Sequence, residues 1–294
     1  MHGILIYEKA AAIYNQGGIA IYLEEAKKLD ISLRLVYYEE LTYGICDNSL
    51  FLEYEGKPID RIDFAINRCR DYRLANHLQA MGIRVFNNAK VNRIGNHKWE
   101  TYAYLSGYHI PMPNTLFVPN EKIKSFLKAV KNEVVVKAVH GHGGNQVCLY
   151  HPELPNEVER VYDIIKNEDV VIQPFIPGKG QDLRVYVIGN RIIGSVLRTA
   201  TKDFRSNFSL GGQVEPYTLN EKEIIQVMKI MDCFSFDYVG IDFIVQEEGS
   251  LLFNEIEDIV GARMLYQYTD IDAIRLYMQH IKICLSKNDN LIIK

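Results

Sequence analysis

The sequence lacks the features that mark several large classes of protein. Its 294 residues contain no apolar run that approaches the length of a membrane span. The N-terminal segment becomes charged at Glu8 and Lys9, too early for a secretory signal peptide. The formal net charge of -4 predicts no general affinity for nucleic acid. We therefore expect a globular protein that has neither a membrane nor a nucleic acid as its partner.

Cysteine is scarce and dispersed. The chain has five cysteines with no close pair among them: Cys46, Cys69, Cys148, Cys233 and Cys284. This spacing gives neither a disulfide framework nor a zinc motif, and it predicts a reducing, cytoplasmic setting. Two glycine fingerprints are also missing, because neither GxGxxG nor the GxxxxGK[ST] of a P-loop occurs where a nucleotide fold requires it.

The most informative stretch that is present is an expected hairpin. Alternating apolar residues predict strands at 238–245 and 251–256, joined by a turn at 246–250. A four-residue connection places Asp242 directly opposite Glu255, and a two-residue connection makes them diagonal neighbours on one face. An odd slip in register separates them.

Three carboxylates are expected on that face: Asp242, Glu255 and Glu257. They repel one another unless a cation lies between them. Ligands that are all oxygen select a hard divalent ion, so the pattern predicts Mg²⁺ or Mn²⁺. A solvated acidic strand end is the alternative, but Asp242 lies among aliphatic residues and favours the metal.

The first 90 or so residues alternate between expected strands and helices. The strands are expected at 4–7, 33–37, 51–54, 64–67 and 84–86, with helices at 19–29 and 71–81. This order predicts a small α/β domain with a parallel sheet. Arg68 and Arg70 follow one strand end, where such sheets bind ligands, so they either hold a substrate carboxylate or are surface charges.

A glycine-rich loop follows in the middle of the chain. Lys137 lies within an expected strand at 134–139, which leads into His140-Gly141-His142-Gly143-Gly144 and a second strand at 147–150. Backbone amides of Gly143 and Gly144 can cover phosphates while Lys137 adds a positive charge, although an ordinary flexible hairpin fits as well. The two histidines lack a third soft ligand, which disfavours a transition-metal site.

Two arginines interrupt the apolar strands of a later hairpin. Arg184 and Arg198 lie within expected strands at 182–188 and 191–199, and if they face the carboxylates they suit a phosphate. The polar loop at 201–213 contains Arg205 and Asn207 and has the length of a lid. Together with the lysine, the glycine loop and the carboxylates, these are the parts that hold a triphosphate and its metal ions.

At this point the sequence resembles the ATP-grasp superfamily, in its RimK-like branch of amino-acid ligases. Five segments carry the resemblance in the family's order: NHKWETYAYLSGYHIPMPNT, VVVKAVHGHGGNQV, VIQPFIPGKGQDLRVYVIG, GSVLRTATKDFRSNFSLGG and VGIDFIV…LFNEIED. The resemblance implies an α/β fold whose α+β grasp lobes follow a small N-terminal parallel-sheet domain. The implied units are residues 1–94, 95–170 with the glycine loop, and 171–294 with the metal site.

The resemblance also implies roles for individual residues. Nucleotide contacts are implied for Lys98, Lys137, Gln173, Pro174, Phe175, Ile176 and Asp182, and the residue pattern described above adds Gly143, Gly144 and Arg184. Arg198, Asn207 and Lys137 are implied to be catalytic, near the terminal phosphate and the reacting acyl group. Asp242 and Glu255 resemble the metal pair. Arg205 and Arg263 join Arg68 and Arg70 as candidate substrate residues.

One departure from the family pattern concerns the end of the hairpin. The family's motif is Glu-x-Asn followed by a Pro-Gly turn, whereas this chain has Glu255-Ile256-Glu257-Asp258 and no such turn. Glu257 thus replaces a neutral metal ligand with a charged one, and the altered turn puts the family's usual substrate in question.

The implied function is an ATP-dependent ligase with Mg²⁺ or Mn²⁺ as cofactor. It would join an amine to a carboxylate through an acyl phosphate, adding an amino acid such as glutamate to an amino acid, peptide or protein. The alternatives are a regulatory ATP-binding module without turnover, a kinase, or a ligase that makes thioesters. Relatives of this type often form dimers or tetramers, so a homo-oligomer is possible.

Overall fold

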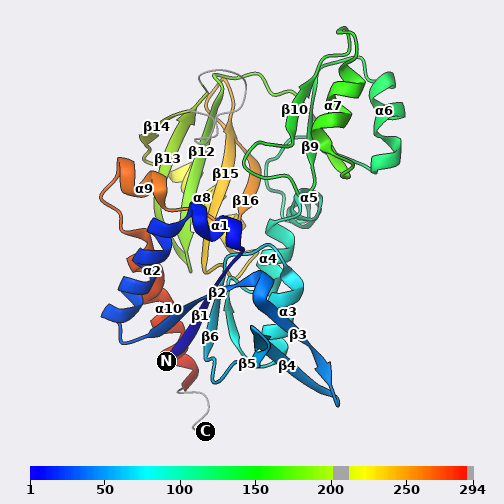
Figure 1. The fold of residues 1–294 in the computed structure, drawn as a ribbon. Helices are drawn as coiled ribbons and strands as arrows, with labels where there is room; N and C mark the ends of the chain where they lie inside the picture. Colours follow the sequence, from blue (N-terminus) through cyan, green and yellow to red (C-terminus); the bar gives the residue numbers. More distant parts are fainter. Residues whose placement is uncertain (201–211, 290–294) are drawn as a thin grey trace.

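The computed structural model describes residues 1–200 and 212–289, whose strands form four sheets (Figure 1). The first sheet is parallel, and its strands in spatial order are β2 (Ser32–Tyr37), β1 (His2–Tyr7), β6 (Phe64–Asn67) and β7 (Arg84–Phe86). Successive residues of β1 point to opposite faces. Leu5 and Tyr7 pack with helices α1 (Lys9–Tyr14), α2 (Gln16–Lys28) and α10 (Ala273–Asp289), and Ile4 and Ile6 pack with α3 (Tyr72–Ala80).

The N-terminal unit departs from the expected elements. Helix α1 was not expected, and the helix expected at 19–29 begins at Gln16, so Gly17 and Gly18 lie inside the first turn of α2. The strand expected at 51–54 belongs to a separate antiparallel sheet, made of β3 (Leu41–Cys46), β4 (Ser49–Tyr54) and β5 (Lys57–Pro58) after the short helix η1 (Tyr38–Glu40). Asp47 and Asn48 connect β3 to β4 with φ of 46° and 60°, as a two-residue hairpin turn requires.

The middle lobe has a core of its own. Its antiparallel sheet has the order β10 (Val147–Tyr150), β9 (Val134–Ala138), β11 (Val170–Pro174) and β8 (Leu116–Val118). Two helices, α6 (Ile123–Ala129), preceded by η2 (Asn120–Lys122), and α7 (Glu157–Ile165), pack against it. The lobe projects from the rest of the molecule in Figure 1. A limit between residues 170 and 171 would cut β11 at its start, so we place the end of this lobe after Pro174.

The C-terminal lobe is built on a five-stranded sheet. Its spatial order is β14 (Gln213–Pro216), β13 (Arg191–Thr199), β12 (Gln181–Ile188), β15 (Tyr238–Val245) and β16 (Leu251–Glu257). One face packs on α8 (Glu221–Met231), α4 (Ala89–Gly95) and α5 (Lys98–Ser106), through residues such as Val185 and Ile241. The other face packs on α9 (Arg263–Tyr268), α10 and the N-terminal helices, through Tyr186 and Tyr238. The N-terminal unit and the C-terminal lobe therefore share a core.

The register of the last hairpin depends on an extra residue. The turn between β15 and β16 has five residues, 246–250, and Phe243 pairs with Phe253. Continued without interruption, that register would place Asn254 opposite Asp242 and turn Glu255 to the far face. A β-bulge at Asn254 restores the pairing of Asp242 with Glu255. The predicted turn at 246–250 and the predicted facing of the two carboxylates are confirmed, but the bulge produces this facing and not a four- or two-residue connection.

Candidate active site

A cavity of about 230 Å³ lies between the middle and C-terminal lobes. Residues from the glycine loop, β9, β11, the segment after β11, β12, β15 and β16 line it. The lining includes these residues predicted for nucleotide or metal: Lys98, Lys137, Gly144, Gln173, Pro174, Phe175, Ile176, Asp182, Asp242 and Glu255. We call this the first cavity.

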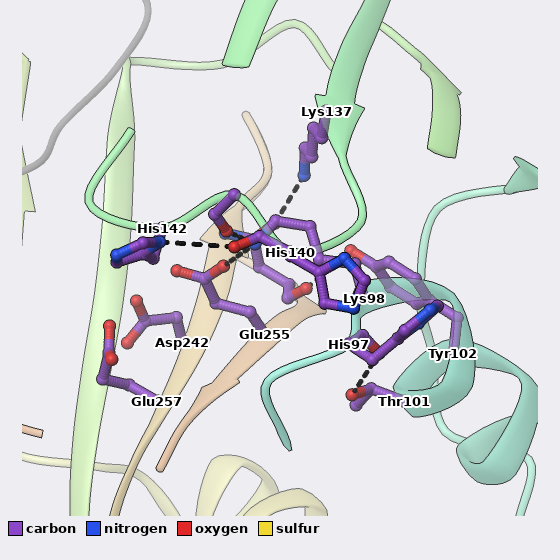
Figure 2. Close-up of polar contacts among 12 residues, drawn as sticks. His97, Lys98, Thr101, Tyr102, Lys137, His140, His142, Asp242, Glu255 and Glu257 are labelled. Atoms are coloured by element: carbon purple, nitrogen blue, oxygen red, sulfur yellow. Dashed lines mark hydrogen bonds and ion pairs between the residues drawn. The ribbon is translucent and has the colours of Figure 1, made fainter. Parts of the chain in front are cut away.

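Two lysines enter the first cavity from different elements (Figure 2). Lys137, in β9, is 8% exposed, and its Nζ donates to Oδ1 of Asn254 at 2.8 Å. Burial lowers the pKa of Lys137 to about 8, and the nearby charge of Lys98 contributes. Lys98 begins α5, and its Nζ donates to the carbonyl of Gly141 at 2.6 Å and to Oε2 of Glu255 at 2.8 Å. The cavity thus offers two cationic amines at one end of the glycine loop.

Two guanidinium groups hold the buried carboxylate of Asp242. Arg184 donates to both oxygens from Nε and Nη2, at 2.6 Å each, and Arg198 donates from Nη2 to Oδ2 at 2.8 Å. Burial alone would raise the pKa of Asp242, but the guanidinium groups outweigh it and lower the pKa to about 2. Asp182 also accepts from Arg198, and burial raises its pKa. These four side chains extend from the face of the sheet that meets the N-terminal unit.

The three carboxylates predicted to bind metal gather below the glycine loop, yet they face two cavities (Figure 2). Asp242 and Glu255 line the first cavity. Burial opposes the ionisation of Glu255, but the charge of Lys98 outweighs it and lowers the pKa of Glu255. Glu257 lines a neighbouring cavity, 3.8 Å from Nη2 of Arg184 and 3.9 Å from Nη2 of Arg70.

The donor set of the first cavity fits a hard divalent cation. Two ionised carboxylates, Asp242 and Glu255, and the amide oxygen of Asn254 line the same wall. Oxygen donors of this kind suit Mg²⁺ or Mn²⁺. In this structure the positive charges of Arg184 and Lys98 balance the two carboxylates.

The neighbouring cavity, of about 730 Å³, lies where the N-terminal unit meets the C-terminal lobe, and we call it the second cavity. Its charged lining side chains are Glu8, Arg68, Arg70, Arg184, Arg198, Glu257 and Arg263. Gly143 also lines it, and His142 lines both cavities. The loop that covers the first cavity therefore also forms a wall of the second.

The predicted substrate arginines that the structure describes meet in the second cavity. Nη2 of Arg68 donates to the carbonyls of Ile259 and Val260, at 3.1 Å and 2.9 Å, and so fixes the turn after β16. Nη1 of Arg263 donates to Oη of Tyr14 at 2.9 Å, which links α9 to α1. Arg70 approaches Glu257. Arg205 and Asn207 lie outside the described residues.

Sequence reasoning missed several residues of these cavities. The bulge at Asn254 could have been recognised from the sequence. Phe253 and Ile256 both pack in the core although they are three residues apart, whereas residues on one face of an unbroken strand are an even number apart. Glu8 and Tyr14 lie near the N-terminus in ordinary helical sequence, and no local pattern distinguishes them.

The turn after Glu257 is anchored by a second feature that the sequence did not reveal. Asp258, 3% exposed, accepts hydrogen bonds from the amides of Asn87, Asn92 and Asn96, at 2.8, 2.7 and 3.0 Å. Burial raises the pKa of Asp258 against the effect of these donors. Asn96 has the residue type of a helix N-cap, but it donates to this cluster, and His97 is the N-cap of α5. The cluster fixes one wall of the second cavity.

The family model described as a RimK-like ATP-grasp domain matches residues 95–281, more than half of the chain. The chain belongs to the RimK-like ATP-grasp family. The matched range contains the five segments on which the resemblance rested, so the predicted family is confirmed.

Two relatives of this ATP-grasp protein carry names of enzymes. A probable alpha-L-glutamate ligase of Pasteurella multocida (strain Pm70) is 28% identical over 211 residues, which are 70% of this chain and 66% of the relative. N-acetylaspartylglutamate synthase A of Mus musculus is 24% identical over 268 residues, which are 85% of this chain and 70% of the relative. The chain thus spans about two thirds of the length of these relatives. The predicted enzyme class, an ADP-forming carbon–nitrogen ligase, is confirmed at the level of the family.

Solved structures support the fold. A RimK domain ATP-grasp protein from Sphaerobacter thermophilus DSM 20745 superposes with a TM-score of 0.68 at 18% identity, covering 95% of this chain and 98% of that one. The ATP-grasp ligase PsnB, complexed with a phosphomimetic variant of its minimal precursor, Mg and ADP, gives a TM-score of 0.66 at 15% identity, covering 97% and 98%. The predicted ATP-grasp fold with an N-terminal parallel sheet is confirmed. Among the helices of residues 1–200 and 212–289, none has the length and apolar character to traverse a bilayer.

Proposed function

We propose that the protein is an ATP-dependent ligase that joins a carboxylate to an amine through an acyl phosphate. The observation that carries the proposal is the contact between the two cavities. The first holds two lysines and two ionised carboxylates, the second is rich in arginine, and His142 lines both. A nucleotide in the first cavity could point its terminal phosphate toward a substrate in the second.

The first cavity offers groups for each part of ATP. The amines of Lys98 and Lys137, with the backbone of Gly143 and Gly144, suit the phosphates. The segment Gln173 to Ile176 joins the two lobes, and its backbone suits the adenine edge. Asp182 suits the ribose.

A divalent cation would be held by Asp242 and Glu255. When bound, Mg²⁺ or Mn²⁺ offsets phosphate charge and polarises the transferring group. Glu257 faces the second cavity and would approach such an ion from the substrate side. The cation would then replace Lys98 as the partner of Glu255 and Arg184 as a partner of Asp242, and the two cationic side chains would be released to pair with the phosphates.

The proposed reaction has two steps. A substrate carboxylate attacks the γ-phosphorus and ADP leaves, giving an acyl phosphate. The amine then attacks the acyl carbon, loses a proton, and phosphate leaves as the amide forms. Lys137 and Arg198 would stabilise charge on the transferring phosphoryl group, and Arg184 shares the carboxylate of Asp242 with Arg198. We also propose the predicted catalytic role for Asn207 and the predicted substrate role for Arg205.

We further propose an amino acid such as glutamate as one substrate and an amino acid, peptide or protein as the other. Arg68, Arg70 and Arg263 supply guanidinium groups for carboxylates in the second cavity. The names of the relatives, a glutamate ligase and an N-acetylaspartylglutamate synthase, favour this class. A homo-oligomer and a cytoplasmic location stay predictions.

The test is ADP release by the full chain against pairs of amino acids and small peptides, with mass detection of the adduct. The proposal requires that release depend on both a carboxylate and an amine, and that the adduct be their sum less one water. Release without an amine, with a phosphorylated product, would identify a kinase. A requirement for a thiol would identify a thioester-forming ligase, and nucleotide binding without turnover would identify a regulatory module.

A further inference from the structure

Outside both cavities, the N-terminal sheet ends in a strand whose outer edge is open. β2 is the outermost strand, and among the described strands it pairs only with β1. Its outer edge makes no backbone hydrogen bond to another described residue. Unpaired N–H and C=O groups attract further strands, so natural edges are usually blunted by proline, by several charges or by a bulge. The six residues of β2 contain one charge, Arg34, and neither a proline nor a bulge.

A mostly apolar groove of about 210 Å³ lies beside this edge. α1 and α2 contribute Ile13, Ile19 and Leu23 to its walls, and β2 contributes Leu35 and Tyr37. Ile13 is 71% exposed, which is unusual for an aliphatic side chain of this size. A strand added to the edge would bury every second side chain against these walls.

The alternation of β2 determines which strand fits there. Leu33, Leu35 and Tyr37 pack toward the core that contains α1 and α2, whereas Val36 packs toward the core that contains α3. Arg34 is exposed. Residues directly opposite each other in an antiparallel pair lie on one face of the sheet. An added strand must therefore present apolar residues at alternate positions, and β2 has this pattern itself.

We propose that β2 of a second copy of this chain occupies the edge, paired antiparallel about a two-fold axis that passes through Leu35 perpendicular to the sheet. Leu35 then lies opposite Leu35 of the second copy, and Leu33 lies opposite Tyr37 of the second copy. The contact is self-complementary, as a closed dimer requires. The two four-stranded sheets become one continuous sheet, and the groove of each copy is filled by leucines of the other.

Charge and strand length select this register over its neighbours. An axis through Arg34 would place two guanidinium groups directly opposite each other, which destabilises a strand pair. An axis through Val36 would pair only residues 35–37, because β2 ends at Tyr37. The axis through Leu35 pairs residues 33–37 and places Arg34 opposite Val36 of the second copy.

The proposed interface also adjoins the second cavity. Tyr14 lines that cavity and directly follows Ile13, which lines the groove. Pairing of the two copies would therefore support α1, which forms one wall of the second cavity.

The first experiment traps the register by disulfide cross-linking of the full chain, with the exposed Cys46 changed to serine. Opposite residues of an antiparallel pair have Cα atoms about 4.5–5.5 Å apart, which a disulfide can bridge. Leu35→Cys should therefore form a covalent dimer under mild oxidation. Leu33→Cys is the matched control, because its two copies would be offset by four residues, about 13 Å along the strands. Equal cross-linking of both variants, or none in Leu35→Cys, would overturn the proposal.

A second experiment does not depend on these variants. Sedimentation of the wild-type chain should give at least twice the 33.9 kDa mass of one copy. Ile13→Asp places a charge in the groove and should raise the dissociation constant of the dimer by roughly tenfold or more. Ile225→Asp, at another exposed isoleucine, on α8, should leave it unchanged. A monomeric wild-type chain, or equal effects of the two substitutions, would refute the interface. Neither readout involves ATP or turnover, so failure here leaves the proposed ligase function untouched.

Discussion

The two cavities differ in how the chain builds them. The first draws mainly on paired strands of two lobes, and strand pairing fixes the direction of its side chains. The second draws on α1, α2, the end of β6, the turn after β16 and α9. Regular strands place the groups suited to a phosphate chain, whereas helix ends and turns place the groups suited to a variable substrate.

The one residue of the metal motif that departs from the family pattern, Glu257, also distinguishes the two cavities. The neutral residue of the family motif is replaced on the strand that forms both cavities, yet Glu257 lines the second. Asp242 and Glu255, which line the first, match the family. By the resemblance, this chain keeps the family's residues in the first cavity, which we propose for the nucleotide, and departs from them in the second cavity, which we propose for the substrate.

The largest effect is expected from Glu255→Gln in the first cavity. The change removes a charge that the proposed cation and Lys98 both need, so ADP release should fall by roughly 100-fold or more. Glu247→Gln, in the exposed turn of the same hairpin, is the matched control and should leave the rate unchanged. An ADP-release rate within threefold of wild type for Glu255→Gln would remove the first cavity from the reaction.

The next largest effect tests how the wall of the second cavity is held. Asp258→Ala removes one acceptor from each of three asparagine amides, those of the buried Asn87 and Asn92 and of the half-buried Asn96, which should lower the free energy of unfolding by about 2–4 kcal/mol. Urea unfolding followed by circular dichroism measures this loss. Asp232→Ala, at the exposed end of α8, should change stability by less than about 0.5 kcal/mol. Equal losses in the two variants would show that the asparagine cluster has no special role.

A smaller effect is expected from Arg263→Gln in the second cavity, which should change substrate binding without changing ATP binding. Arg263→Gln should raise KM for the carboxylate substrate by roughly tenfold, because one charged hydrogen-bond donor is lost. The Kd for ATP should stay within twofold of wild type, since Arg263 does not line the first cavity. Arg275→Gln, on the exposed side of α10, is the control. A weaker Kd for ATP with an unchanged KM would reverse the assignment of the cavities.

The smallest effect concerns pH in the first cavity. Burial lowers the pKa of Lys137 to about 8, so the amine of the free protein loses its proton as pH rises from 7 to 9. Nucleotide affinity should therefore weaken over this range, by up to about tenfold. Lys137→Met should bind more weakly at pH 7 and lack this component of the pH dependence. Calorimetry of ADP binding at several pH values gives the comparison, and parallel profiles for both proteins would contradict it.

The sequence predicted the strands and the first cavity well, for a physical reason. Lys137 and Asp242 of the first cavity, like Arg184 and Arg198 next to Asp242, are charged residues within apolar strands, and such interruptions are visible in a linear pattern. Which of these side chains lie opposite one another follows from the register of the paired strands, and the alternation of apolar and polar residues largely determines that register.

The second cavity was less predictable because its residues meet only in three dimensions. Arg68 and Arg70 were recognised from a strand end, but Glu8 directly precedes α1 and Tyr14 ends it, and this segment has an ordinary pattern. The antiparallel placement of β4 was also missed, because a short apolar strand carries no signal for the sheet to which it belongs.

Because of the extra residue at Asn254, the side chains of β16 that face the glycine loop depend on the number of residues in the turn before it. A five-residue turn alone would present the wrong side of β16 to the glycine loop, and one additional residue corrects it. Lengthening or shortening the turn by two residues keeps the phase, whereas a change of one inverts every later side chain unless position 254 changes with it. The turn at 246–250 can therefore gain or lose residues only in even numbers without displacing Glu255, even though none of its residues lines either cavity.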